Sequence, residues 1–397
     1  MKSENDVVIV SAVRTAVGRA GGSLKHMNSG VLASKVIESV IKRSGIEQSS
    51  VDEVILGEVR STTESSNVAR VAALRAGLPE ETPAFTVNRL CASGIQAITS
   101  GVQQIQSETA QVVIAGGTEN LSQAPIYLRN SRYGEGNPKL VDSNLEAGQQ
   151  PQETYGENLG MGMTAENVAE RYAISREDQD AFALESQRRA RAAIDAGNFK
   201  DEIVPLEGKE RKKTFVFAVD EHPRDTTLEK LSSLSPAFKK GGSVTAGNAC
   251  GRNDGAAVVM LMKRSKAAQL GLQPLATIRR WSTAGVSPEV MGIGPVPAVQ
   301  KLLANTQMSA EDIGVWELNE AFASQALAVI RELNLPMDRV NPNGGAIALG
   351  HPLGATGARI TISLLFEMMR KKQQYGVATL CVGGGQGMAL LLEREEA

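Results

Sequence analysis

The sequence of 397 residues predicts an α/β fold made of two similar halves, with a loop domain inserted into the first half. In both halves, short apolar runs alternate with amphipathic runs, which is typical of strands covered by helices. Within the first half, a polar stretch that contains many Gly, Pro and Gln residues interrupts this alternation. Insertions of this size usually carry a ligand function.

The first half begins with a strand pattern at 6–13 and an amphipathic helix pattern at 29–45. Strand and helix patterns then alternate along the chain, at 52–59, 67–77, 83–88, 91–106 and 111–117. Such alternation predicts parallel strands with helices packed on them. We assign 1–120 to this half, together with 248–272, where the run "DGAAVVMLM" resumes strand character.

The loop domain is assigned to residues 121–247. One long helix pattern stands out within it, at 175–197, with Ser175 as its predicted N-cap and Asp178 three residues later.

The second half is assigned to 273–397 and repeats the alternation of the first. Its predicted elements are a strand at 275–286, a helix from Val296, a strand at 315–319, helices at 320–333 and 354–372, and a hairpin at 376–393. Three glycines, Gly383 to Gly385, are placed to turn this hairpin.

Composition excludes several classes of function. The formal net charge is −2, so no basic excess predicts binding to nucleic acid or to an anionic membrane. The N-terminal residues carry charges where a signal peptide needs an apolar core, and no apolar run is long enough to span a bilayer. The three cysteines are widely spaced, which predicts free thiols in a reducing compartment. We therefore expect a cytoplasmic protein.

Cys91 is a candidate nucleophile because it lies between a strand pattern and a helix pattern. A helix start would lower the pKa of its thiol, and Gly94 would let a substrate approach the backbone. A plain buried thiol is the alternative. Of the three histidines, His351 lies in a glycine-rich stretch, where a ligand or another chain segment comes close, whereas His26 and His222 lie in polar turns and are expected at the surface.

Cys381 precedes the glycines of the predicted hairpin and, like Cys91, ends a strand pattern. Ligands of α/β sheets bind at the carboxyl ends of strands. The glycines leave several backbone N–H groups free, so they form either a simple tight turn or an oxyanion hole. Metal-binding, P-loop and dinucleotide-binding motifs are missing from the sequence, so neither a metal site nor a nucleotide cofactor is expected.

Seven motifs resemble those of the thiolase family, in the order and spacing of that family and over nearly the whole chain. They are "NRLCASG", "AGGTENLSQAP", "MTAENVAERYAISREDQDAFALESQ", "SVTAGNACGRNDGAA", "ELNEAFA", "NPNGGAIALGHPLGATGAR" and "CVGGGQGMA". The resemblance implies five layers, αβαβα, built from two similar halves with a loop domain inserted in the first. It also implies a homotetramer assembled as a dimer of dimers.

The resemblance further implies a reaction, the reversible CoA-dependent cleavage of 3-ketoacyl-CoA through an acyl-enzyme on Cys91. His351 is then the activating base and Cys381 the second acid/base. Asn319 would hold a water that joins His351 in one oxyanion hole, and the backbone N–H groups of Cys91 and Gly383 would form the other.

Coenzyme A is implied as a substrate, with no permanently bound cofactor. By similarity, the residues that contact it are Met161, Arg224, Ala246, Cys250, Met291, Ala321 and Phe322. The chain departs from its relatives at Cys250, where most have Ser, and at Gly160, where the acetoacetyl-CoA thiolases have His. A thiol donates a weaker hydrogen bond than a hydroxyl.

Three alternatives stay open at this point. The condensing ketoacyl synthases share the fold, but they commonly pair their Cys with two His or with His and Asn, which Cys381 does not match. A Cys-dependent hydrolase would leave Cys381 and the glycine-rich hairpin unexplained. A thiolase-like protein that binds acyl-CoA or lipid without catalysis would typically lack one of the catalytic residues, and all of them are present here.

Overall fold

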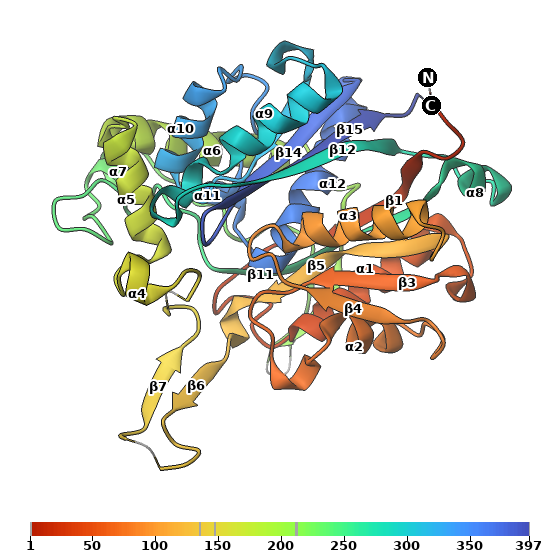
Figure 1. Cartoon of the computed structure of the whole chain (residues 1–397), viewed down its shortest axis with the longest axis horizontal. Coiled ribbons are helices and arrows are strands. Elements are labelled where there is room, and N and C mark those ends of the chain that lie inside the picture. Colours follow the sequence, from red (N-terminus) through yellow and green to blue (C-terminus); the bar gives the residue numbers. More distant parts are fainter. Residues whose placement is uncertain (1, 135, 147, 211–212, 397) are drawn as a thin grey trace.

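The computed structural model describes residues 2–134, 136–146, 148–210 and 213–396, and its helices and strands form five layers (Figure 1). The first half contributes one side of a large mixed sheet, in the order β1–β11–β5–β3–β4. These strands are β1 (Val7–Thr15), β3 (Glu53–Gly57), β4 (Ala84–Val87), β5 (Val112–Asn120) and β11 (Asn253–Lys263). Because β11 lies between β1 and β5, the chain returns to the first half after the insertion, as predicted.

The second half contributes the other side of the sheet, in the order β12–β15–β14–β13. The strands are β12 (Ala276–Gly285), β13 (Val315–Leu318), β14 (Tyr375–Val382) and β15 (Gln386–Arg394). Val8 pairs with Thr277 and Ile9 with Ala276, and these two pairs join β1 to β12. Apart from the additional edge strand β4, the two halves therefore have the same strand order, read outward from the junction.

The strands of the first 120 residues, β1, β3, β4 and β5, all run in one direction, as predicted, and the antiparallel members of the sheet are β11 and, in the predicted hairpin, β15. Pairs β3–β4, β3–β5 and β13–β14 are parallel, but β11 and β15 run antiparallel to both of their neighbours. In the second half the cause is the tight turn Gly383–Gly385, because a connection this short can only join antiparallel strands.

Helices occupy the other three layers. One outer layer contains α1 (Ser29–Ser44) and α2 (Val68–Arg75), and the other contains α9 (Pro295–Thr306) and α10 (Ala323–Glu332). The middle layer consists of α3 (Ser93–Gln106) and α12 (Leu353–Lys371), which share one apolar cluster with strands of both halves (Figure 1). Further short elements are β2 (Gly18–Arg19), β8 (Ile203–Val204), α8 (Arg264–Gln269) and α11 (Ala346–Leu349).

Helix α1 shows how local sequence sets an element of an outer layer. The side chain of Asn28 accepts a hydrogen bond from Val31 N and caps the helix, and Gly45 ends it in the left-handed conformation, with φ 74°. Between these caps, Leu32, Ile37 and other apolar residues on one face are buried against the sheet. Burial of each large apolar side chain stabilises the fold by about 1.5–3 kcal/mol.

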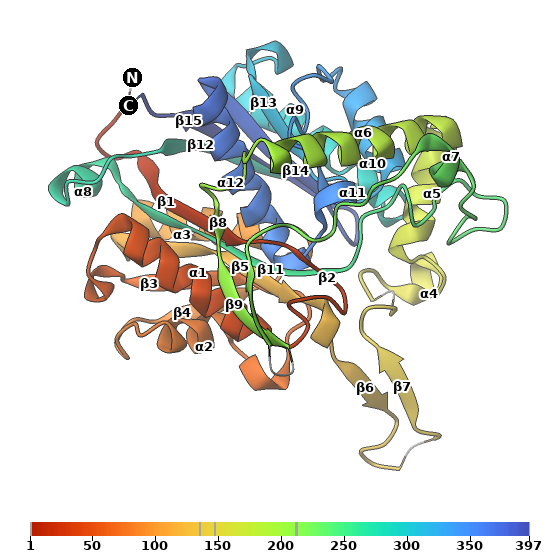
Figure 2. The same ribbon diagram turned by 180° about the vertical axis from the view of Figure 1, so that it is seen from behind.

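The segment predicted as a loop domain has its own secondary structure but is anchored in the first core. It contains β6 (Ile126–Arg129), β7 (Lys139–Asp142), α4 (Gln152–Tyr155), α5 (Met161–Arg171), α6 (Arg176–Asp195), β9 (Leu206–Glu210), β10 (Lys213–Phe217) and α7 (Leu228–Ser232). As predicted, the hydroxyl of Ser175 caps α6 by accepting from Asp178 N at 3.0 Å. Seen from behind, α6 crosses the second half beside α10 and α11 (Figure 2).

A buried ion cluster holds this segment to β1. The guanidinium of Arg14 lies 2.7 Å from Glu202 and 2.7 Å from Asp220, and all three side chains are almost completely buried. The guanidinium also lies over the ring of Phe199, 5.1 Å from its centre. Removing one partner of such a cluster leaves an uncompensated buried charge, which costs about 3–5 kcal/mol. The path of the chain around the functional site is therefore strongly fixed.

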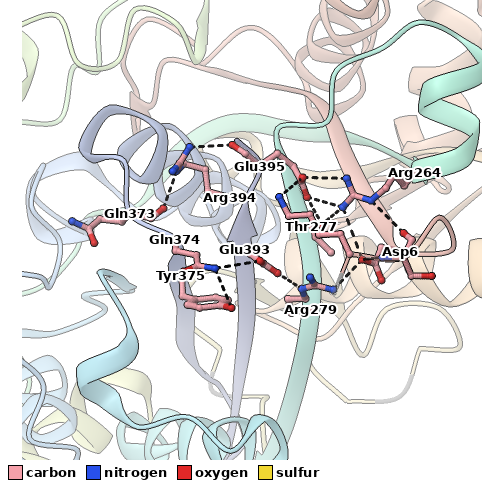
Figure 3. Close-up of polar contacts among 12 residues, drawn as sticks. Asp6, Arg264, Thr277, Arg279, Gln373, Gln374, Tyr375, Glu393, Arg394 and Glu395 are labelled. Atoms are coloured by element: carbon pink, nitrogen blue, oxygen red, sulfur yellow. Dashed lines mark hydrogen bonds and ion pairs between the residues drawn. The ribbon is translucent and has the colours of Figure 1, made fainter. Parts of the chain in front are cut away.

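Polar contacts hold the N-terminal and C-terminal segments of the chain to neighbouring elements (Figure 3). Arg264 binds Glu395 at 2.7 Å, and Arg279 on β12 binds both Asp6 and Glu393. These contacts connect the segments before β1 and after β15 with the start of β12, next to the short junction between the two halves of the sheet. In the described part of the chain, no helix is both long and apolar enough to cross a membrane.

Candidate active site

Cys91 and His351 occupy equivalent positions in the two halves. Cys91 lies two residues before the start of α3, and His351 lies two residues before the start of α12. The two helices pack backbone to backbone, because a Cβ at Gly94 would lie 2.5 Å from Ala358 N and one at Gly357 would lie 2.5 Å from Ile95 N. The prediction that Gly94 makes room for a substrate is therefore wrong, since it makes room for α12.

One cavity of about 450 Å³ contains most of the predicted site. The predicted residues among its lining are Cys91, Met161, Cys250, Met291, Ala321, Phe322, His351, Cys381 and Gly383, and Gly160 lines it as well. Asn319 lies behind His351, with its Nδ2 3.5 Å from His351 Nε2. Arg224 and Ala246 are not among the lining residues, and Arg224 donates a hydrogen bond to the carbonyl of Ala246 at 3.2 Å.

A strained turn holds Cys91 in the cavity. Leu90 has a positive φ of 47°, which non-glycine residues rarely adopt and which is often found at functional sites. The buried hydroxyl of Ser93 braces this turn by donating to Leu90 O at 2.6 Å and accepting from Arg89 N at 2.9 Å. Arg89 in turn donates to Gln386 at 3.1 Å, which links the turn to the hairpin that carries Gly383.

Burial controls the protonation of Cys91 more strongly than the helix start does. The sequence predicted a lowered pKa, but burial raises the pKa of the Cys91 thiol to about 11. The backbone N–H groups of Gly383 and of Cys91 itself oppose this rise, because both favour the thiolate by hydrogen bonding. These two N–H groups therefore lie near the sulfur.

His351 is buried and held in one tautomer. Thr356 Oγ1 donates to Pro352 O at 2.9 Å, so it accepts from the Nδ1–H of His351, 2.6 Å away. This arrangement leaves Nε2 as the acceptor nitrogen, next to Asn319. Burial lowers the pKa of His351 to about 3, and the charge of Arg359 adds to this effect. The imidazole is therefore neutral and able to accept a proton at Nε2.

The cavity also contains the other two thiols of the chain. Burial raises the pKa of Cys250 to about 12 and that of Cys381 well above its ordinary value, and the charge of the neighbouring Cys91 thiolate adds to both rises. All three thiols are free and close enough to influence one another. In the resting protein, each of them is therefore protonated at neutral pH.

The burial of His222 differs from the expectation, and the role of Thr356 was not predicted. His222, expected at the surface, is half-buried: its ring packs against Gly251, and burial lowers its pKa to about 4. His26 is exposed, as expected. Thr356 was missed, although a hydroxyl in the first turn of a helix, five residues after a histidine, is a signal for such a contact.

Known proteins resemble this chain over its full length. Residues 7–265 match the thiolase N-terminal domain, and residues 272–394 match the thiolase C-terminal domain. The acetyl-CoA acetyltransferase of Pseudomonas aeruginosa is 50% identical over 394 residues, which cover 98% of this chain and 100% of that protein.

Solved structures agree with this result. The crystal structure of the Bacillus anthracis acetyl-CoA acetyltransferase superposes with a TM-score of 0.95 at 48% identity and covers 100% of both chains. That of human mitochondrial 3-ketoacyl-CoA thiolase in complex with CoA superposes with a TM-score of 0.93 at 44% identity, covering 100% of this chain and 99% of the other. With both domains matched and half of its residues shared with a full-length relative, the chain belongs to the thiolase family.

Proposed function

We propose that the protein catalyses the reversible cleavage of 3-ketoacyl-CoA by CoA, which in reverse is the Claisen condensation of two acyl-CoA molecules. The observation that carries this proposal is the meeting of Cys91, His351, Cys381 and Gly383 in one cavity. The names of its relatives, acetyl-CoA acetyltransferase and 3-ketoacyl-CoA thiolase, support it as well. Neither a ketoacyl synthase nor a hydrolase is favoured, because both would leave Cys381, a second thiol in the described cavity, without a role.

The first step forms an acyl-enzyme. His351 Nε2 takes the proton of Cys91, and the sulfur attacks the C3 carbonyl of the substrate. The N–H groups of Cys91 and Gly383 stabilise the oxyanion, each at a typical value of about 3–4 kcal/mol of the barrier. The C2–C3 bond then breaks, and its electron pair moves to C2 of the departing acetyl-CoA.

The second thiol supplies the proton that C2 needs. Cys381 is buried and protonated, so it protonates C2, and acetyl-CoA leaves. The proton held by His351 then passes to the Cys381 thiolate. The thiol of CoA next gives its proton to His351 and attacks the acyl group, and Cys91 leaves and takes that proton back from His351. This transfer costs little energy because one thioester replaces another. Asn319 Oδ1 is buried without a partner among the described residues, which supports its proposed role in holding a water beside His351.

Coenzyme A binds as a substrate, across the segment 121–247. The apolar contacts that we propose for its pantetheine arm are Met161, Met291, Ala321 and Phe322, which pack in one cluster beside Cys381. Arg224 is exposed and tied to Ala246, which suits contact with the nucleotide end. At position 250 the arm meets a thiol in place of the hydroxyl that most relatives have.

The assembly that we propose is a homotetramer, a dimer of dimers that works in the cytoplasm. The support is the β6–β7 hairpin, which projects from the rest of the chain in both views (Figures 1 and 2). Its apolar side chains are exposed, with Ile126 at 65% and Leu140 at 72%. Exposed apolar patches of this kind mark interaction sites. The compartment follows from the mechanism, which needs Cys91 and Cys381 as reduced thiols.

The test of the proposed function is a cleavage assay on the purified chain. We expect acetoacetyl-CoA and free CoA to give two molecules of acetyl-CoA for each acetoacetyl-CoA consumed, measured by chromatography with mass detection. Release of acetoacetate would indicate a hydrolase. Binding of acetoacetyl-CoA without any turnover would indicate a non-catalytic acyl-CoA carrier and would overturn the proposal.

Thr356→Val should lower kcat/KM for this cleavage by about 10- to 150-fold, since a hydrogen bond to a charged group contributes about 1.5–3 kcal/mol. The bond from His351 Nδ1 strengthens when the imidazole takes the proton of Cys91, and valine cannot accept it. Thr356→Ser keeps the acceptor and should restore activity. The test is to measure steady-state rates of both variants, with circular dichroism as the check on folding. An equal loss of kcat/KM in both variants would mean that Thr356 contributes by packing alone.

A further inference from the structure

Two arginines line the active-site cavity without a visible partner. The guanidinium groups of Arg60 and Arg252 make no hydrogen bond or ion pair with any described residue. Arg252 is exposed, whereas Arg60 is half-buried, and its Nε is fully buried without an acceptor. Because Arg60 lines the cavity and its guanidinium has no acceptor among the described residues, a ligand in the cavity can supply one.

The carboxylates near Arg60 are engaged elsewhere or neutral. Glu146 lines the same cavity but binds Arg129 at 2.8 Å. The oxygens of Glu119 accept three backbone N–H bonds, from Val59, Arg60 and Gly354. Burial and the neighbouring Glu119 raise the pKa of Glu58 to about 8, which keeps it largely uncharged at neutral pH. Glu119 lies close enough for the charge of Arg60 to lower its pKa, but it accepts no hydrogen bond from the guanidinium, whose N–H groups are therefore available to a ligand.

Arg60 belongs to the end of the cavity that receives the acyl group. It follows β3, the neighbour of the strand β4 that leads to Cys91, and its charge lowers the pKa of Cys91. The phosphates of CoA are separated from the thioester sulfur by the whole pantetheine arm, so a cation this close to Cys91 is not placed for them. The surrounding lining is apolar, with Val59, Leu121 and Leu145 suited to the methylene groups of an acyl chain.

We propose that Arg60, assisted by Arg252, binds a carboxylate at the far end of the acyl group, so that the preferred substrates are CoA monothioesters of 3-oxo-dicarboxylic acids. This inference rests on the proposed thiolase reaction. Cleavage transfers the part of the acyl group that carries the carboxylate to Cys91, and acetyl-CoA leaves with the electron pair of the broken C2–C3 bond and one proton. Arg60 thus holds the carboxylate both in the substrate and in the acyl-enzyme, until CoA takes the acyl group.

The test compares two substrates of equal length, the CoA thioesters of 3-oxohexanedioic acid (as the monothioester at C1) and of 3-oxohexanoic acid. We expect wild-type kcat/KM to be about 30-fold or more higher for the first, in line with a charge-assisted, bidentate contact. In Arg60→Met this ratio should fall to about one or below, and Arg60→Lys, which keeps the charge but loses the bidentate fork, should retain only part of it. Arg75→Met removes a charge from the exposed end of α2 and is the matched control, with the wild-type ratio expected.

Binding provides a readout that does not depend on turnover. Calorimetric titration in the Cys91→Ser background, which does not take up the acyl group, should give a lower Kd for succinyl-CoA than for butyryl-CoA, and adding Arg60→Met should remove this difference. Equal values for the charged and the neutral ligand in the presence of Arg60, or a difference that survives in Arg60→Met, would overturn the inference. An equal loss for both ligands would overturn it as well, because Arg60 would then contact CoA itself. Wild-type cleavage of acetoacetyl-CoA without preference for the carboxylate would leave the proposed function intact and remove only this inference.

Discussion

Cys91→Ser is expected to lower kcat for cleavage by about a thousandfold or more and to abolish the covalent acyl adduct. Because burial raises its pKa to about 11, Cys91 is almost entirely protonated at pH 7.5, so the attack depends on transfer of the proton to His351. A serine hydroxyl is a much weaker acid, and its acyl product is an ester, which does not exchange readily with CoA. Both half-reactions therefore fail in this variant.

Intact-protein mass measurement after incubation with acetyl-CoA checks this prediction. The wild type should gain the mass of one acetyl group, and Cys91→Ser should gain none. Cys250→Ser is the matched control, because it makes the same chemical change at another thiol of the cavity and should keep the adduct. An adduct of normal mass and rate in Cys91→Ser would transfer the role of nucleophile to a different residue.

The elements that the sequence predicted well are those whose signals are local. Ser175 caps α6 as expected, because a hydroxyl three residues before a backbone N–H needs no tertiary contact to act. The hairpin at Gly383–Gly385 is present, with Gly384 and Gly385 at positive φ. That hairpin makes β15 antiparallel to β14, whereas the antiparallel direction of β11 could not be predicted from alternation, which reveals the type of an element and not its partner in the sheet.

The positions of the catalytic residues were predicted from the same kind of local signal. The pKa of Cys91 was not predicted correctly. Cys91 and His351 were placed before helices, and the structure has them there. What brings them together is the contact of Gly94 with Ala358 and of Gly357 with Ile95, which depends on two helices more than 250 residues apart in sequence. Cys91 packs against the apolar cluster that these helices share, and this burial raises its pKa where the helix start alone would lower it.

Arg60 and Thr356 were missed for a related reason. In the sequence, Arg60 is an ordinary charged residue after a strand, and Thr356 is an ordinary hydroxyl residue in the first turn of a helix. Arg60 is identified as a candidate functional residue only by the absence of an acceptor for its Nε among the described residues. Thr356 is identified only by its 2.6 Å contact with His351. A sequence shows neither a missing partner nor a distance.

Cys381→Ala is expected to keep the acyl adduct on Cys91 and to lose cleavage and condensation by about a thousandfold, within the range that general acid–base catalysis contributes. Only the step at C2 needs a proton donor or acceptor there, whereas acyl transfer between Cys91 and CoA uses His351. Alanine fits the site of the buried Cys381 without a clash, so the variant should fold.

Two measurements separate the half-reactions of Cys381→Ala. Exchange of labelled CoA into acetyl-CoA reports acyl transfer and should persist. Exchange of the methyl protons of acetyl-CoA with deuterated water reports proton removal at C2 and should vanish, while Cys250→Ala, which removes the other thiol of the same cavity, should retain it. Persistent proton exchange in Cys381→Ala would mean that another base serves C2. Loss of both exchanges in a folded protein would mean that Cys381 also supports the attack of Cys91, because its sulfur lies close enough to influence that thiol.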